Sequence, residues 1–404
     1  MKLKSTLSLV LLLLMWRPTS SQGIIQDPEH RFRVSIDNGV IIAENNGVPK
    51  YSVPLFTIEN PVHLNQDDSI PESLLYRVYR YQLGDDGRFY VADVGQNRIV
   101  VYDATGNYLF SFGRTGDGPG EFRAPTLRWI RNGQIVVDDD DLDRISLWNS
   151  DGSFVDFFSP TTKSSKIIAL FLTPEFDIIE KARETEYSQD RSRVTTNVLT
   201  IYRPDGGIAG SISASPNHHP PTIEAGGRMM FFTGRGEYYG PISDCEYFPR
   251  QGILVHNSAE PELKWFNPSS ALSRIVSTGL KRENVSSEER RSVFRMLDRR
   301  TSIARNAQTR ALSQAQRDNA KIAEFKALWK EIIVDDEGYC WLKVFSLYGE
   351  DPTTEISDKY RVYSPEGEYL GDAYLPGSLV SICQGHVLTI QEDMETGSIE
   401  LIAY

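Results

Sequence analysis

The sequence predicts an all-β protein, a six-bladed β-propeller closed by an N-terminal strand and carrying a helical hairpin insertion before the fifth blade. Two observations predict the propeller: an internal repeat of 46 residues and a hairpin pattern that recurs along most of the chain. A third observation, a block with helical periodicity and basic charge, predicts the insertion. The chain has 404 residues, which is enough for six such repeats.

The repeat is clearest in segments 87–112 and 133–158, which align without a gap and match Asp93 with Asp139. Each segment has two runs of β-branched and aromatic residues separated by turns rich in Asp and Asn. This pattern is typical of strands joined by tight turns. With a lead-in strand before its first Gly, each repeat supplies the four strands of one blade.

Weaker copies of the hairpin occur at residues 201–206, 265–270 and 362–367. The last copy, residues 379–404, has strand patterns at residues 387–391 and 398–403 but ends before a fourth strand. We expect the N-terminal part of the chain to supply that strand, with residues 54–59 (PLFTIE) as the best candidate. Such a strand would close the ring and remove an open sheet edge.

The N-terminus has the features of a secretory signal peptide: basic residues Lys2 and Lys4, an apolar stretch at 7–16 and a small polar stretch. The apolar stretch is about half of the ~20 residues that a membrane-spanning helix needs. We therefore expect residues 1–21 to be a signal peptide, residues 22–404 to be one propeller domain, and no transmembrane segment. No cysteine stands near the expected cleavage site, so a lipid anchor is not expected, and the predicted location is periplasmic or secreted.

Composition excludes some classes of partner. The net charge is -12, with 43 Lys and Arg against 55 Asp and Glu, which argues against nucleic acid or an anionic membrane as the main partner. Three cysteines, Cys245, Cys340 and Cys383, leave one unpaired in any pairing scheme. A disulfide framework is therefore excluded, and buried thiols are expected. We expect a monomer.

Residues 87–106 (GRFYVADVGQNRIVVYDATG), followed by FGRTGDGPGEFRAP at 112–125, resemble the NHL-repeat family. More narrowly, they resemble a group of bacterial exported proteins described as six-bladed β-propellers of unassigned function, and segments 36–45 and 360–376 are similar to that group too. The resemblance implies an NHL/TolB-like propeller. Enzymes similar to this family use channel histidines with a metal, or channel carboxylates with calcium, but no such residue set can be matched to this sequence.

The predicted insertion spans residues 284–330. Ser286 to Glu289 (SSEE) forms a capping-box pattern, and apolar residues follow at helical spacing. Residues 281–330 contain 13 Lys and Arg against 6 Asp and Glu. Two interpretations are open: a lid whose arginines extend over an acidic propeller surface, or a docking surface or gate over the channel. We favour the lid.

Two local motifs suggest chemistry. Residues 113–122 (GRTGDGPGEF) are glycine-rich but lack the Gly-Lys-Ser/Thr ending of a phosphate-binding loop, so we expect a structural turn between blades. An acidic run could bind calcium, although its spacing is not that of an EF-hand. Since Asp139 matches Asp93, we expect it to accept hydrogen bonds from backbone amides in the hairpin. The acidic run consists of Asp138, Asp139, Asp140, Asp141 and Asp143.

Two further sets of residues are candidates. Arg98 and Arg144 occupy matching repeat positions, which predicts hydrogen bonds between strands. His256 and His386 lie in strand-like runs and are the first candidates for metal ligands in the channel, although a structural role is favoured for both. His218 and His219 lie in a Pro-rich segment that we expect to be an exposed loop. The remaining histidines are His30 and His63.

The sequence contains no recognisable catalytic motif, so no catalytic or cofactor-binding residue is assigned and the metal ligands, if any, are unknown. We predict an exported binding or interaction module that takes a protein or small ligand on a propeller face. The alternative is a metal-dependent (calcium or zinc) lyase or lactone hydrolase with its site in the central channel. A third hypothesis is a docking protein that uses the basic insertion.

Overall fold

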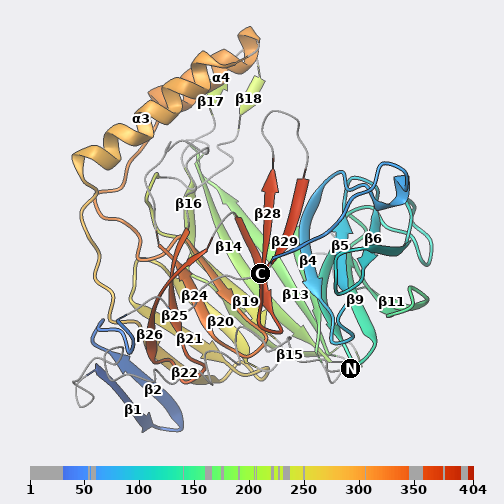
Figure 1. Cartoon of the computed structure of the whole chain (residues 1–404). Coiled ribbons are helices and arrows are strands. Elements are labelled where there is room, and N and C mark those ends of the chain that lie inside the picture. The colour runs from blue at the N-terminus through green and yellow to red at the C-terminus, as the bar shows by residue number, and fades with distance from the viewer. Residues whose placement is uncertain are drawn as a thin grey trace.

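The computed structural model is a β-propeller with six blades, each a sheet of four or more strands (Figure 1). The fold class predicted from the sequence is thereby confirmed. The described residues are 31–52, 55, 61–139, 141–159, 166–173, 177–189, 192–203, 205, 207–219, 223–225, 228–230, 237–248, 251–304, 306–344, 358–375, 378–392 and 399–404.

Blades 1 to 3 follow one another along the chain, and each is built from antiparallel neighbours. Blade 1 consists of β4 (Val78–Leu83), β5 (Phe89–Asp93), β6 (Arg98–Tyr102) and β7 (Tyr108–Phe112). Blade 2 consists of β8 (Pro125–Arg131), β9 (Gln134–Asp139), β10 (Arg144–Asn149) and β11 (Phe154–Phe158). Blade 3 consists of β12 (Lys166–Leu172), β13 (Ile178–Tyr187), β14 (Arg193–Tyr202) and β15 (Ile208–Ser213), with β16 (Asn217–His219) paired to β14.

Blades 4 and 6 include strands from the N-terminal part of the chain, whereas the strands of blade 5 follow one another in sequence. Blade 4 consists of β19 (Ser243–Phe248), β20 (Gly252–Asn257), β21 (Glu262–Phe266) and β22 (Leu272–Ser277), extended outward by β2 (Val40–Asn45) and β1 (Phe32–Asp37). Blade 5 consists of β23 (Glu331–Val334), β24 (Cys340–Lys343), β25 (Asp358–Tyr363) and β26 (Tyr369–Leu375). Blade 6 consists of β27 (Ser378–Cys383), β28 (His386–Glu392), β29 (Ile399–Ala403) and β3 (Val62–His63).

The recurring hairpins predicted from the sequence all join the third strand of a blade to the fourth. In five blades the same backbone hydrogen bond closes this turn, from the amide of one residue to the carbonyl of the residue four positions later. The hairpin is therefore the repeated unit that sets the register of the outer strands. The donor and acceptor residues are Asp103 and Asn107, Asn149 and Ser153, Arg203 and Gly207, Asn267 and Ala271, and Ser364 and Glu368.

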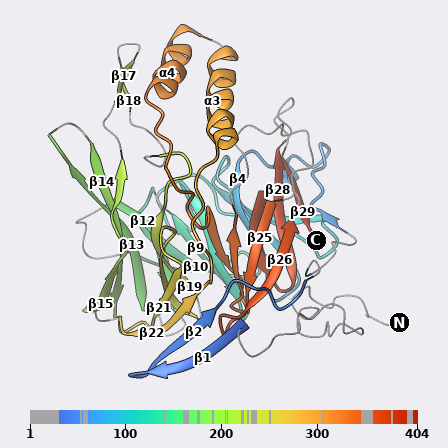
Figure 2. The same ribbon diagram turned by 90° about the vertical axis from the view of Figure 1, so that its left-hand side faces the viewer.

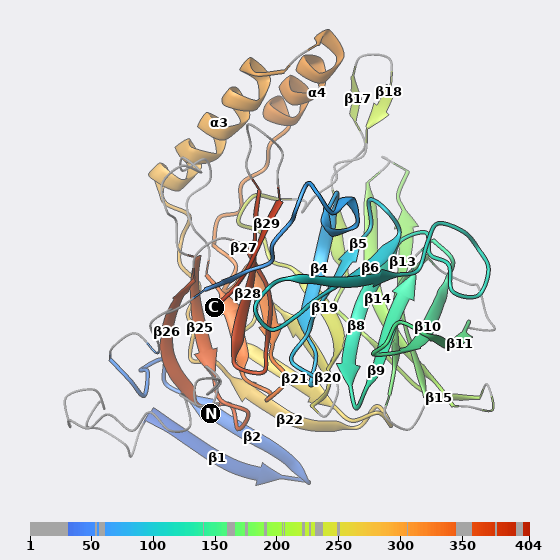
Figure 3. The same ribbon diagram turned by 45° about the vertical axis from the view of Figure 1, so that its right-hand side comes forward.

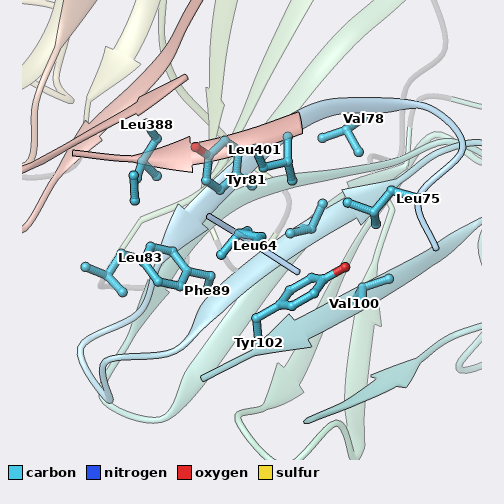
Figure 4. Packing of buried hydrophobic residues seen from close by; sticks show 12 residues of the cluster. Leu64, Leu75, Val78, Tyr81, Leu83, Phe89, Val100, Tyr102, Leu388 and Leu401 are labelled. Atoms are coloured by element: carbon cyan, nitrogen blue, oxygen red, sulfur yellow. The ribbon is translucent and has the colours of Figure 1, made fainter. Parts of the chain in front are cut away.

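The hydrophobic core is divided among the gaps between blades. Six clusters of buried side chains in the described residues each join two neighbouring blades, so the clusters follow the ring once round. Figure 4 shows the cluster between blades 6 and 1, where Leu388 and Leu401 pack against Tyr81 and Phe89. The Tyr81 hydroxyl donates to the carbonyls of Thr389 and Ile402 at 2.9 and 2.6 Å. Because both faces of a blade are covered in this way, strands such as β5 are buried along their whole length.

An N-terminal strand does close the ring, as the sequence predicts, but it is not the segment expected. β3 (Val62–His63) pairs with β29, with His63 opposite Ile402, and becomes the fourth strand of blade 6. The expected segment, residues 54–59, is described only at Leu55, whose side chain packs between blades 5 and 6. The predicted signal peptide at 1–21 lies outside the described residues.

The chain before β3 runs along the outer edges of three blades in turn. β2 pairs in parallel with β22 on blade 4, and the amides of Lys50 and Tyr51 then donate to carbonyls of Tyr369 and Leu370 on blade 5. β3 follows on blade 6, so the N-terminal segment spans blades 4, 5 and 6. We call residues 31–52, 55 and 61–63 the rim segment. It was not predicted from the sequence.

Two helices, α3 (Ser287–Ser302) and α4 (Ala307–Asp318), lie between blades 4 and 5 in the chain and stand on one side of the propeller beside the hairpin of β17 (Ile223–Ala225) and β18 (Arg228–Met230) (Figures 2 and 3). A capping box of Ser286 and Glu289 begins α3. The helices rest on a cluster that includes Tyr239, Val293 and Leu297.

The contacts of the helices differ from the expected lid. Arginines of the two helices pair with carboxylates of the insertion itself, as Arg295 does with Glu288 and Arg317 with Asp298. Among the described residues, no ion pair joins α3 or α4 to an acidic side chain of a blade. Apolar packing and backbone hydrogen bonds therefore hold the insertion in place, such as those from the Tyr238 amide to the Lys321 carbonyl and from the Leu328 amide to the Ser258 carbonyl. No helix in the described part of the chain has both the length and the apolar character needed to cross a membrane.

Candidate functional site

A cavity of about 1930 Å³ lies at the centre of the ring. Its wall includes Val78 of β4, Thr126 of β8, Ile333 of β23 and Leu379 of β27, which all lie on first strands of blades. Near its mouth it is lined by the tip of the β13–β14 hairpin, by β16 and by Lys321, which follows α4. The cavity therefore opens on the side of the propeller that carries the helices.

A buried ion pair network joins blades 3 and 4 at the cavity wall. The Lys181 ammonium lies 2.9 Å from Oδ1 of Asp244 and 2.9 Å from Oε2 of Glu246. Asn197 of β14 donates to the same Asp244 oxygen at 2.8 Å, and its amide oxygen accepts from Arg183. Lys181 is almost fully buried, whereas Glu246 leaves 34% of its side chain accessible because it faces the cavity.

These contacts fix the charges of the network. Burial alone would lower the pKa of Lys181, but Glu246 and Asp244 outweigh burial and raise this pKa well above its ordinary value. Burial would raise the pKa of Glu246, but Lys181 outweighs it and the pKa is lowered. Since both groups stay charged around neutral pH, they are suited to recognition by fixed charges rather than to transfer of a proton.

Blades 1 and 2 contribute two arginines on their first strands. Arg128 is the extra residue of a β-bulge in β8, and its Nε donates to Oδ2 of the buried Asp138 at 3.1 Å. Its guanidinium also lies 4.8 Å from the centre of the Phe171 ring. Arg80 of β4 lines the cavity nearby, and burial together with Arg128 lowers the pKa of its guanidinium.

His256 of β20 lines the cavity beside this network and is buried. The indole Nε1 of Trp329 donates to its Nδ1 at 3.4 Å, so the remaining proton of the neutral ring is on Nε2. Burial lowers the pKa of His256 to about 4, and Asp244 only partly offsets this effect. The imidazole is therefore neutral at pH 7.

This burial predicts a pH-dependent stability. The pKa of His256 is about 4 in the folded protein and about 6.5 in a model peptide, so the unfolded chain takes up a proton at a higher pH than the folded protein does. The contribution of neutral His256 to the free energy of unfolding is therefore complete above pH 6.5 and is lost as the pH falls towards 4. The loss is on the order of 3 kcal/mol over that interval. We expect His256→Asn, whose amide oxygen can still accept from Trp329, to lose less stability than the wild type between pH 7 and 4.5. Urea unfolding at a series of pH values measures this, and parallel curves for the two proteins would contradict it.

The other histidines named from the sequence do not meet His256. His386 contacts the carbonyl of Gln384 at 3.0 Å, and His63 pairs with Glu400 at 2.7 Å near the surface. His218 and His219 were expected in an exposed loop, but they form β16, and His219 bonds to Thr195 at 2.8 Å at the cavity wall. His30 lies outside the described residues.

The repeated Asp and Arg positions are structural. Asp93 accepts from the amides of Tyr76 and Arg77, and Asp139 accepts from those of Arg123 and Ala124, so each carboxylate fixes the chain that leads into its own blade. Asp139 also accepts from the Leu142 amide at 3.2 Å in the turn between β9 and β10, which is the contact expected within the hairpin, whereas the bonds to the lead-in segment were not expected.

The matched arginines only partly have the expected role. Arg98 of β6 donates to Oδ2 of Asp93 on β5, which is the expected bond between strands. Arg98 also donates to the carbonyls of Glu72 and Leu74, and Arg144 to those of Asp117 and Gly118, so both arginines bind the segment before their blade as well.

The remaining sequence motifs are also placed. Residues 113–122 connect blades 1 and 2 as a turn, where the Phe122 ring packs so closely on Gly113 that a Cβ there would lie 2.3 Å from it. In the acidic run, Asp138 and Asp139 are buried with hydrogen-bond partners, Asp141 is exposed, and Asp140 is not described. Within the described ranges, no three His, Cys, Asp or Glu side chains are grouped so that they could hold a metal ion.

The three cysteines are free thiols, and burial raises the pKa of each to about 12. Thiols with such a pKa are unreactive, as expected from the sequence. The functional groups that sequence reasoning missed are Arg80, Lys181, Asp244 and Glu246. They come from different blades at unrelated spacings, so no local motif marks them.

The six sheets arranged around a central cavity define the protein as a six-bladed propeller. Residues 71–158, which cover blades 1 and 2, match the model of a family described as "6-bladed beta-propeller". This match confirms the resemblance to six-bladed propellers stated from the sequence. No curated protein matches the chain.

Three solved structures illustrate the similarity. A Bacteroides fragilis protein described as exported is 11% identical, covers 85% of this chain and 94% of its own, and has a TM-score of 0.47. A member of the DUF4221 family from Bacteroides vulgatus is 11% identical, with 86% and 96% covered and a TM-score of 0.43. Virginiamycin B lyase from Staphylococcus aureus is 12% identical, with 81% and 80% covered and a TM-score of 0.33. Likeness at this level carries no information about what this chain binds.

Proposed function

We propose that the protein is an exported binding module that takes a ligand into the central cavity from the side that carries α3 and α4. The observation that supports this most is the wall of the cavity, where Lys181, Asp244 and Glu246 hold fixed charges in a rigid frame built by several blades. Binding sites commonly combine a large concave surface with a few fixed polar groups. Export is proposed from the basic start and short apolar stretch of the sequence.

A pair of variants tests this function. Thr126 is half-buried on the cavity wall, so Thr126→Trp fills part of the cavity without entering a packed core. Leu109 is 41% exposed on the outer strand β7, so Leu109→Trp adds an indole away from the cavity. We expect ligands found by thermal shift, in a panel of sugars, amino acids, nucleotides and organic acids, to raise the melting temperature of the wild type and of Leu109→Trp by a few degrees.

The same ligands should have no effect on Thr126→Trp, provided that its circular dichroism spectrum shows a folded protein. Equal shifts in the two variants would place the binding outside the cavity and contradict the proposal. A panel in which nothing binds the wild type would contradict it as well.

The metal-dependent lyase or lactone hydrolase remains the second candidate, and a separate measurement decides between them. Elemental analysis of protein purified without chelators, together with melting curves before and after EDTA, tests for a resident metal. About one metal ion per chain, with a lower melting temperature after EDTA, would favour the enzyme. The binding module predicts that EDTA leaves the melting temperature unchanged.

A further inference from the structure

The charge of the cavity wall differs from that of the whole protein. The chain has a net charge of -12, yet the described residues that line the cavity include five basic and four acidic side chains. The lining is thus slightly positive inside an acidic protein. The basic residues are Arg80, Arg183, Arg193, Lys321 and Lys330.

The carboxylates deep in the cavity already have cationic partners. Asp244 and Glu246 share the Lys181 ammonium, and Asp138 is bound by Arg128 and also accepts the Leu170 amide at 3.0 Å. None of these three acidic groups is left without a partner. These carboxylates are therefore already paired, and another cation on the cavity wall needs a different counter-ion.

Arg80 is such a cation. Its Nε is buried and has no hydrogen-bond partner, and no carboxylate of the described residues lies within ion-pair distance of its guanidinium. Glu246 and Arg128 lie near enough to act on Arg80 electrostatically, Arg128 repelling it and Glu246 attracting it. Arg80 as a whole is half-buried, so its guanidinium has lost part of its hydration without gaining a counter-ion at ion-pair distance, which is costly.

Arg183 is a second cation without a carboxylate partner among the described residues. It lies two residues after Lys181 on β13 and lines the cavity. Its only described bond is from Nε to the neutral amide oxygen of Asn197 at 3.2 Å, so its charge is not compensated. The cavity thus holds two guanidinium groups, from blades 1 and 3, that are available to an incoming anion.

We propose that the ligand of the cavity carries a carboxylate or phosphate group and that the Arg80 guanidinium binds this group. The inference rests on the proposed function, because it names the class of ligand that the binding module accepts. A planar guanidinium presents several N–H donors to two oxygens of one oxyanion, which gives both attraction and orientation. A ligand group of this kind would supply, from the cavity that Arg80 lines, the counter-charge that no described carboxylate places within ion-pair distance.

Calorimetric titration at low salt with inorganic phosphate, pyrophosphate and citrate tests this inference. We expect at least one of these anions to bind the wild type and its affinity to fall with added sodium chloride. Arg80→Gln should weaken that binding at least tenfold. The matched control is Arg33→Gln, which removes the same charge from an exposed position on β1 and should leave the affinity unchanged. Tighter binding of phosphate or pyrophosphate than of citrate would indicate a phosphate-bearing ligand. Tighter binding of citrate would indicate a carboxylate-bearing ligand.

The stability of the ligand-free variant separates binding from a structural role. If Arg80 serves the ligand, Arg80→Gln without ligand should melt at the wild-type temperature or above it, since an uncompensated buried charge is removed. A clear loss of stability would instead assign Arg80 to the framework and overturn the inference, as would anion binding that is equal in wild type and Arg80→Gln. Absence of binding by all three anions would also overturn it.

The two proposals fail in different ways. If neutral ligands of the panel bind the wild type but not Thr126→Trp, and Arg80→Gln binds them equally well, the binding module stands and the anion site is wrong. If no ligand distinguishes Thr126→Trp from Leu109→Trp, the cavity is not the binding site and both proposals fall.

Discussion

Replacing Gly106 with alanine is expected to lower the free energy of unfolding by roughly 3 kcal/mol, because the substitution acts at the point where the ring closes. Gly106 lies in the turn between β6 and β7 with a φ of +86°, and a Cβ there would lie 2.0 Å from the carbonyl oxygen of His63. His63 belongs to β3, so relief of the clash must displace the strand that completes blade 6. The hydrogen bond from the Asn65 amide to the Gly106 carbonyl would be strained as well.

Gly87 offers a matched control within the same blade. It also has a positive φ, +76°, but a Cβ there meets no atom within 4 Å. Gly87→Ala should therefore cost only the backbone strain, about 1 kcal/mol. Urea unfolding of both variants measures the difference. Equal losses in the free energy of unfolding would show that the close approach of residue 106 to His63 is not what destabilises Gly106→Ala.

Replacing Lys181 with methionine is expected to cost about 3 kcal/mol, towards the lower end of the range for breaking a buried ion pair. The substitution keeps the aliphatic stem but leaves Asp244 and Glu246 facing each other without their shared ammonium. Both carboxylates are about one-third exposed to the cavity, which moderates the cost. Unfolding curves at pH 7 measure the effect.

Two comparisons identify the cause of that loss. Asp244→Asn and Glu246→Gln, added to Lys181→Met, should restore most of the stability, because the uncompensated charges are gone. Lys264→Met, which removes an ammonium that is 39% exposed and pairs with Glu262 at 3.5 Å, should cost less than 1 kcal/mol. If the triple variant is as unstable as Lys181→Met, packing of the lysine stem and not its charge is responsible.

The strands of blades 1 and 2 could be predicted from the sequence because their repeat is strict and their turns have a fixed chemistry. The same reasoning placed the last strands of blade 6 at residues 387–391 and 398–403, close to the observed β28 and β29. Local sequence patterns are sufficient to predict strands that pair with the strands next to them in the sequence.

The closing strand could not be placed in the same way. β3 has two residues and no alternation, and it pairs with β29 more than 300 residues away. The parallel pairing of β2 with β22 is equally non-local. Nothing in the local sequence distinguishes such strands from a loop, and so residues 54–59, which have a stronger β pattern, were chosen wrongly.

The candidate site was the least predictable part, for a related reason. Arg80, Lys181 and Glu246 lie on three blades and meet only when the ring is closed. The sequence indicated histidines and an acidic run, of which His256 and His219 line the cavity and Asp138 binds Arg128. In a propeller the functional groups converge on one axis from every repeat, so their spacing along the chain has no regular form.

The rim segment has a consequence for the order in which the molecule can fold. Arg31 pairs with Glu368 across 337 positions, and β3 pairs with β29 at the far end of the described chain. The first contact cannot form until blade 5 has been synthesised and the second cannot form until blade 6 has been, whereas the hairpins of blades 1 to 3 need only their neighbours. Contacts of such long range slow folding, since the ends of a long chain must first find each other. A polypeptide that must pass through a membrane before it folds would therefore remain open until β29 becomes available to β3.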